Sequence, residues 1–179
     1  PLLAAIAALP ADAARLLGAI ALVGAPIGSD ELAAIAGRDP RTALAVLRRA
    51  LLVDLDGDGA PRLHELVRAA ARAALAPGVE AELHGRLAAA LTTRRDPAAI
   101  VAAVRHYLAA AQPERARAHL VATGKVLLDV GASRDVATLT AELGAGRDRE
   151  LGALRARALA RLLDVAEGEK ALRDRKSVV

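Results

Sequence analysis

The sequence lacks cysteine, methionine, tryptophan and phenylalanine, and Tyr107 is its only aromatic residue. The lack of cysteine excludes disulfides, thiolate zinc sites and cysteine nucleophiles, and it favours a reducing compartment. The lack of aromatic rings argues against a stacking surface for single-stranded nucleic acid. No apolar run reaches about 18 residues without a charge, so no membrane span is predicted.

Catalytic motifs are also missing. Gly124-Lys125 is followed by Val126 and has no glycine at the required spacing before it, so the phosphate-binding loop of an ATPase is not present. No other nucleophile or metal-ligand signature occurs in the chain. We therefore expect a chain without catalytic activity. Its 179 residues suffice for one domain or two small ones, and its net charge of +4 alone is too small to predict nucleic-acid binding.

The first part of the chain has the pattern of short helices followed by a hairpin. Apolar residues at helical spacing after Pro10, Ser29 and Pro40 predict three helices, the third burying Leu47 and Leu51. Alternation over 53–55, a turn at 57–59 and a return over 62–64 predict two strands, and a helix is expected over 65–75, with Leu66 on its apolar face. This order predicts a winged helix-turn-helix domain over residues 1–77.

The remainder has helical periodicity. Helices are expected to begin near Glu80, Pro97, Pro113, Ser133 and Arg149. Alternate starts are spaced by about 33 to 36 residues, close to the period of tetratricopeptide repeats, so residues 78–173 are predicted to form tetratricopeptide-like hairpins. Three histidines lie in these helices, and each is expected to pack or to face solvent: His84, His106 and His119. Residues 174–179 break the pattern, and we interpret them as a non-native tail.

One motif is consistent with calcium binding. The carboxylates of the twelve-residue EF-hand loop would be Asp54, Asp56, Asp58 and Glu65, with Gly59 at the sharp turn. Pro61 and Arg62 oppose this interpretation, because the first lacks a free N–H and the second brings a positive charge to the ligands. A hairpin turn rich in aspartate and glycine explains the same residues, and calcium binding is kept as an alternative.

Arginines on the predicted third helix suggest a second alternative. Arg41, Arg48 and Arg49 lie on the helix that would enter the major groove of DNA, and Arg62 lies on the wing. Arginine reads guanine edges and holds phosphates, so these four residues are candidate DNA contacts of a transcription factor. Acidic residues of the hairpin would repel the DNA backbone, which weighs against this alternative.

Three segments resemble a known family. Residues 9–17 are similar to the opening of the winged-helix domain in STAND-type signalling ATPases, which are bacterial relatives of the NB-ARC apoptosis and plant-resistance proteins. Residues 47–53 look like the helix-to-strand step of that domain, and residues 62–68 resemble its MHD motif. Leu63 stands for the methionine and Glu65 for the aspartate of that motif. The helical part after residue 77 matches the sensor region of the family in architecture, and residues 105–110 are similar to the start of its repeats.

The resemblance implies a cytoplasmic, nucleotide-dependent switch. An upstream ATPase domain, absent from this chain, would hold ADP at rest and exchange it for ATP. The histidine of the motif, His64 here, would contact the ADP β-phosphate and lock the closed form. The repeats would sense a protein or small-molecule signal, and the opened molecule would oligomerise. On this interpretation the chain is a fragment of a longer signal-transduction or transcription regulator, and it binds no cofactor by itself.

Overall fold

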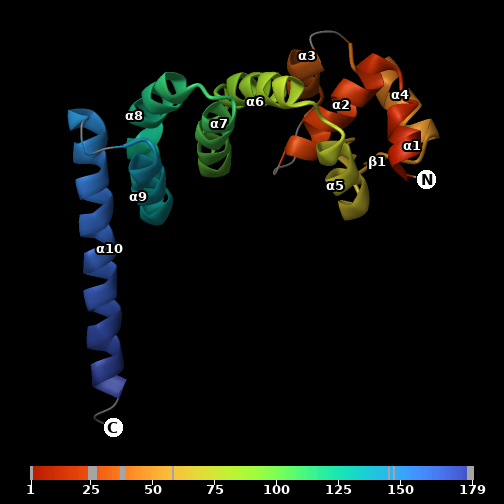
Figure 1. The fold of residues 1–179 in the computed structure, drawn as a ribbon. Coiled ribbons are helices and arrows are strands. Elements are labelled where there is room, and N and C mark those ends of the chain that lie inside the picture. The colour runs from red at the N-terminus through yellow and green to blue at the C-terminus, as the bar shows by residue number, and fades with distance from the viewer. Residues whose placement is uncertain are drawn as a thin grey trace.

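The computed structural model describes residues 2–23, 28–36, 39–57, 59–144, 146 and 148–176, and these are mainly helical, as predicted. Figure 1 shows a bundle of helices at the N-terminal end, from which an array of helices leads away to the C-terminus. The elements are α1 (Leu2–Ala7), α2 (Ala11–Leu22), α3 (Ser29–Ala36), α4 (Arg41–Arg49), β1 (Asp54–Leu55), β2 (Pro61–Arg62), α5 (Glu65–Ala73), α6 (Pro77–Leu91), α7 (Pro97–Ala109), α8 (Pro113–Asp129), α9 (Ser133–Glu142) and α10 (Arg149–Lys176).

The central helix of the N-terminal bundle is α2, which contacts α3, α4, α5 and α6. All its residues from Leu16 to Leu22 are buried, so this stretch is surrounded by other elements on every side. Gly18 allows the side chain of Leu75 to lie close against α2, because a Cβ atom at this position would be 2.6 Å from Cδ2 of Leu75. The two strands pair in antiparallel register, with Asp54 opposite Arg62.

Helix α6 contributes to two hydrophobic cores. Leu83 and Leu87, which are 1% and 0% exposed, lie in the core of the N-terminal bundle. Ala88 lies in the core of the helical array, with residues of α7, α8, α9 and α10. The predicted domain limit at residue 77 thus coincides with the start of α6, while the first core extends into that helix.

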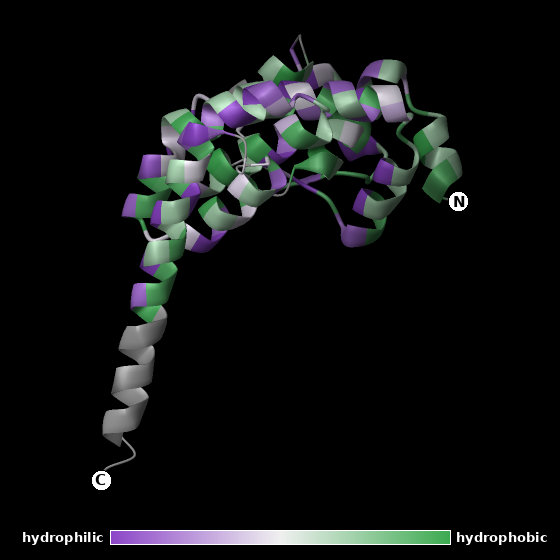
Figure 2. Ribbon diagram, turned by 60° about the vertical axis from the view of Figure 1, so that its left-hand side comes forward, coloured by the Kyte–Doolittle hydropathy of each residue, from purple (hydrophilic) through white to green (hydrophobic). Residues whose placement is uncertain are grey.

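The helices of the array pair mainly with their neighbours in sequence. Helix α7 packs between α6 and α8, and α10 packs on α9 and α8. Helices α8 and α10 meet closely at Gly124, where an added Cβ would collide with the Leu154 side chain. Hydrophobic and hydrophilic residues alternate along the helices in Figure 2, as expected for amphipathic helices that share cores.

The helix starts predicted at Pro97, Pro113, Ser133 and Arg149 are confirmed. The start predicted near Glu80 is wrong, because α6 already begins at Pro77. Proline fits the first turn of a helix, where its missing N–H costs no hydrogen bond. Pro77 therefore opens α6, before the position expected from the sequence.

The expectation that Leu51 is buried is wrong. Helix α4 ends at Arg49, and the amide of Leu52 donates to the carbonyl of Leu47 to close a turn that reverses the chain. Leu51 occupies the left-handed position of this turn, with φ of 58°, and its side chain is 87% exposed. Helix α4 thus ends before Leu51, whereas the spacing of the leucines suggested that the helix continues to that residue.

Two further details of the hairpin and of α5 differ from expectation. The return strand is only Pro61–Arg62, and His64 lies outside it as the residue that caps α5. Leu66 is 68% exposed, while Ala71 of the same helix is buried. The apolar face of α5 is thus rotated away from the one predicted.

Candidate functional site

His64 lies at the junction between β2 and α5, and its side chain is exposed. The backbone there is extended, and the imidazole Nδ1 accepts a hydrogen bond from the amide of Leu66 at 3.3 Å. An imidazole that accepts at Nδ1 carries its proton at Nε2 when neutral. His64 therefore offers an N–H donor to solvent beside the positive end of a helix dipole, which is an arrangement that suits an anion.

Arg68, one turn further along α5, fixes this junction to α2. Its Nη1 donates to the backbone carbonyls of Ile20, Ala21 and Val23 at 3.3, 3.0 and 2.9 Å. These carbonyls belong to the last turn of α2, whose oxygens have no partners within the helix. Arg68 also lies 3.6 Å from Glu65, the residue that stands for aspartate in the resembling motif.

We expect Arg68→Ala to lower the free energy of unfolding by about 2 to 3 kcal/mol, since hydrogen bonds from a charged donor are each worth more than neutral ones. The half-buried carbonyls of α2 would also lose their partner. Urea unfolding followed by circular dichroism measures the effect. The matched control is Arg72→Ala on the same helix, for which a change below about 0.5 kcal/mol is expected, because the side chain of Arg72 is exposed and its backbone carbonyl, which accepts from the amide of Leu75, is kept in the variant. Equal losses in both variants would contradict a capping role.

The carboxylates of the calcium alternative already have partners in the hairpin, or lie apart. Asp56 accepts from the amide of Ala60 at 2.9 Å and from Nε of Arg62 at 3.3 Å. Asp54 is on the exposed strand β1, Glu65 faces Arg68, and Asp58 lies outside the described residues. No group of three potential metal ligands occurs in the described part of the chain. The hydrogen bonds of Asp56 are those of a hairpin turn.

The arginines of the DNA alternative lie on the surface. Arg41, Arg48 and Arg49 are exposed on α4, and Arg41 lies 3.7 Å from Asp39. Arg62 is exposed on β2 but forms an ion pair with Asp56. The structure therefore brings three arginines onto one exposed helix, and places the fourth beside an acidic residue of the hairpin.

A pair of histidines that the sequence did not predict joins α6 to α7. Nδ1 of His84 lies 2.7 Å from Nδ1 of His106, and the ring centroids are 4.9 Å apart. Only one of the two nitrogens carries the proton of this hydrogen bond. Burial lowers the pKa of His106 to about 4, with a smaller contribution from the charge of His84, and burial also lowers the pKa of His84. Along the sequence, His84 and His106 are similarly far from the turn that joins α6 to α7. This spacing is the signal from which their contact could have been predicted, because it brings two residues of a helical hairpin side by side.

The third histidine of the array, His119, has a buried Nε2 atom without a hydrogen-bond partner in the described part of the chain. Burial lowers the pKa of this imidazole as well, with a smaller contribution from Arg95. All three histidines of the array are at least partly buried. Of the two roles expected for them, packing therefore fits better than exposure to solvent.

Comparison with protein-family models, with curated proteins and with solved structures gives no match. Within the described residues, no helix combines the length and the apolar character that crossing a membrane requires.

Proposed function

We propose that this chain is a non-catalytic part of a nucleotide-regulated signalling ATPase of the STAND type, with His64 as the residue that contacts a phosphate of ADP. The observation that carries the proposal is the orientation of His64. Its Nδ1 is held by the amide of Leu66, so its Nε2–H points away from the helix at an exposed N-terminus. That donor beside a helix dipole suits an anionic phosphate supplied by another domain.

The order of elements supports the same proposal. Helices α2, α3 and α4, the short hairpin and α5 follow each other as in a winged helix, and α6 to α10 are consecutive helices as in a tetratricopeptide-like array. Arg68 joins the His64 junction to the end of α2 by hydrogen bonds. A displacement of the junction would therefore also displace α2, the central helix of the bundle. Because α6 contributes to both cores, a signal bound on the array would bear on the same bundle.

The chain would regulate, while the ATPase domain would supply the nucleotide site and the hydrolysis. His64 would stabilise the ADP-bound closed form, and a protein or small molecule on the array would favour the open form. A DNA-binding function receives less support, since Asp39 lies beside Arg41 of α4 and Arg62 is paired with Asp56.

The test begins with the coding sequence upstream of Pro1, where the proposal requires a nucleotide-binding loop in the same frame. In the longer protein so defined, His64→Ala is expected to speed the release of bound ADP about 10- to 100-fold, because one hydrogen bond to a charged group is lost. Release of a fluorescent ADP analogue measures this rate.

The matched control is Leu66→Ala, which alters an exposed side chain on the first turn of α5. Its release rate should equal that of the unchanged protein. The isolated chain should show no measurable affinity for ADP in calorimetry, because one imidazole supplies only a fraction of a phosphate site. An unchanged rate in His64→Ala, or tight binding of ADP to the isolated chain, would contradict the proposal.

A further inference from the structure

Helix α10 closes the array, and one of its sides is covered by other described elements. That side packs on α9 and α8 and buries Leu151, Leu154 and Ala158. In Figure 1, α10 stands at the end of the array, and no described element lies on its far side. The exposed apolar residues over about three turns of this far side are called the outer face of α10: Ala153, Ala156, Leu159, Ala160 and Leu163.

Two leucines make the outer face hydrophobic. Leu159 is 43% exposed and Leu163 is 66% exposed, and their spacing along the helix places the two side chains next to each other. The three alanines beside them are short, so a second helix can come close to both leucines. The last helix of a repeat array normally turns a polar face to the solvent, because water is its neighbour there. An outer face of leucine and alanine therefore indicates a partner that covers it.

Contacts on the covered side fix the rotation of α10 about its own axis. Arg161 donates from Nη1 to the carbonyl of Leu128 and lies 3.4 Å from a carboxylate oxygen of Asp129, both at the end of α8. Leu154 lies against Gly124 of the same helix, where an added Cβ atom would collide with it. Helix α10 cannot turn to bury its outer leucines without breaking these contacts.

Two charges beside the outer face determine which partner fits it. Arg157 and Asp164 are exposed and lie about two helical turns apart, so they are on the same flank of α10. Neither takes part in an ion pair or a side-chain hydrogen bond within the described part of the chain. Because this flank carries one charge of each sign, the sequence of α10 can be complementary to itself.

The spacing of these residues matches an antiparallel pair of α10 helices. When the pair is centred on residues 160 and 161, Leu159 of each copy meets Leu163 of the other. The same alignment brings Arg157 of each copy beside Asp164 of the other. A parallel pair would instead set like charges against each other, which opposes association.

We propose that the outer face of α10 binds the outer face of a second copy of this chain in antiparallel orientation. The contact is repeated by a two-fold axis, so that it closes a dimer and leaves no outer face free. The array of each copy lies on the covered side of its own α10 and does not obstruct the pairing (Figure 1). The dimer is independent of nucleotide binding, and it would form whether or not the proposed function is correct.

Sedimentation equilibrium of the whole chain between about 2 and 500 µM tests the proposal. We expect a monomer–dimer equilibrium with a dissociation constant on the order of 50 µM, because one helix face is a small interface. At about 2 µM, a concentration suited to unfolding followed by circular dichroism, the chain is then a monomer. A chain that stays monomeric at about 500 µM, or that forms assemblies larger than a dimer, would overturn the proposal.

One pair of variants tests the apolar part of the interface. Leu163→Glu should raise the dissociation constant at least tenfold, because it places a carboxylate in both leucine contacts of the dimer. The matched control is Leu66→Glu on α5, a leucine that is 68% exposed and lies outside α10, and it should associate like the unchanged chain. Equal constants in the two variants would overturn the location of the interface.

Charge reversal tests the antiparallel orientation. Arg157→Asp and Asp164→Arg should each raise the dissociation constant roughly fivefold to tenfold, because each sets like charges against each other twice in the dimer. An equimolar mixture of these two variants should associate like the unchanged chain, since one copy then carries two carboxylates and the other two guanidinium groups. Arg48→Asp, an equal change of charge on α4, should have no effect. Single variants that associate normally, or a mixture that does not recover, would overturn the pairing.

Discussion

Replacing Leu87 with alanine is expected to lower the free energy of unfolding by about 3 to 5 kcal/mol, the range of a fully buried leucine that leaves a cavity. Leu87 is 0% exposed and lies in the core of the N-terminal bundle, although its helix also begins the array. The loss should therefore appear in the bundle, which α6 completes. Urea unfolding at neutral pH, followed by circular dichroism, measures it.

Leu163→Ala provides the control, since the same atoms are removed from a side chain of α10 that is 66% exposed. Its effect should stay within about 0.5 kcal/mol. A loss below about 1 kcal/mol in Leu87→Ala would contradict the shared core, because it would mean that α6 does not seal the bundle. In that case the two parts of the chain would be separable near residue 77.

Local signals did not predict α1, but they predicted the order of the elements after it, because helix starts depend on few neighbouring residues. Proline at the first turn marks α7 and α8, and the pattern of alternation with a glycine-rich turn marks the hairpin. Each of these signals involves residues within a few positions of each other. The start of α6 was expected too late, near Glu80, although Pro77 carries the same signal.

Leu51 shows why burial was predicted less well. Its spacing from Leu47 fits a helix, but α4 ends first and the turn that follows turns Leu51 to solvent. Where a helix ends depends on which groups bond to its last carbonyls in place of the regular helical hydrogen bonds. The apolar pattern of the sequence does not carry that information. The same reason applies to Arg68, whose partners are carbonyls far away in the chain.

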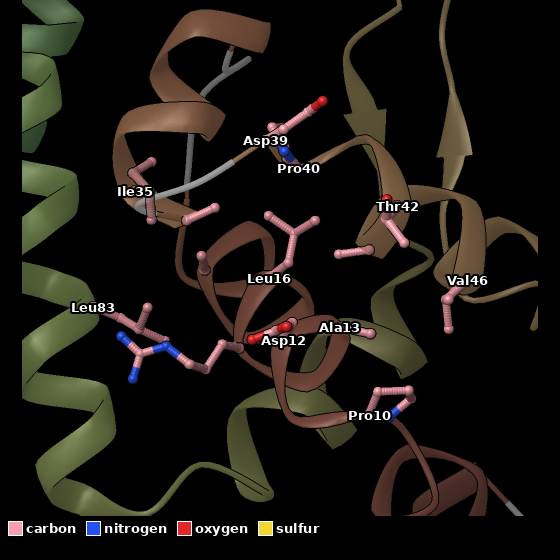
Figure 3. Close-up of a pocket in the computed structure, with 14 residues that line it drawn as sticks. Pro10, Asp12, Ala13, Leu16, Ile35, Asp39, Pro40, Thr42, Val46 and Leu83 are labelled. Atoms are coloured by element: carbon pink, nitrogen blue, oxygen red, sulfur yellow. The ribbon is translucent and has the colours of Figure 1, made fainter.

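The candidate site was only partly predictable from its residues. The position of His64 before a helix follows from the sequence, whereas the bond from Leu66 that orients its imidazole needs the extended backbone at the cap. The groove beside α4 (Figure 3) was not predictable, because residues on α2, α3 and α4 line it together with Leu83 of α6. Contacts between His84 and His106 likewise depend on the register of two helices.

Lowering the pH from 7.5 to 5 is expected to lower the free energy of unfolding by about 2 kcal/mol through His106 alone, and by about 3 kcal/mol once the pH is below 4. The pKa of His106 is lowered to about 4 in the folded chain, against about 6.5 in an unfolded one. The unfolded chain therefore binds more protons between these two values. Stability is fully present above the unfolded pKa and falls as the pH falls toward the folded pKa.

The groups around the pair act in the same window. Burial lowers the pKa of His84, Glu80 opposes this with an oxygen 3.9 Å from Nε2, and Arg72 of α5 adds to the lowering. If both rings were protonated, two N–H groups would face each other across the 2.7 Å contact, so the second proton opposes the pairing of α6 with α7.

Carboxylates contribute at lower pH. Backbone and arginine hydrogen bonds lower the pKa of Asp96, and Arg117 together with backbone amides lowers that of Asp148. Stability from such groups is present above the unfolded value near 4 and is lost only as the pH falls through the lowered values. The interval from pH 7.5 to 5 therefore isolates the buried histidines.

His106→Gln decides whether the histidine pair carries this dependence, since glutamine cannot titrate but can still hydrogen bond to His84. Free energies of unfolding measured in urea at pH 7.5, 6 and 5 should show a loss reduced by about 2 kcal/mol in this variant. Leu163→Ala, which changes an exposed side chain of α10, is the control, and it should retain the full slope. A loss of stability between pH 7.5 and 5 that is as large in His106→Gln as in the unchanged chain would contradict the assignment, because His106 would then not be a group that excludes protons from the folded chain.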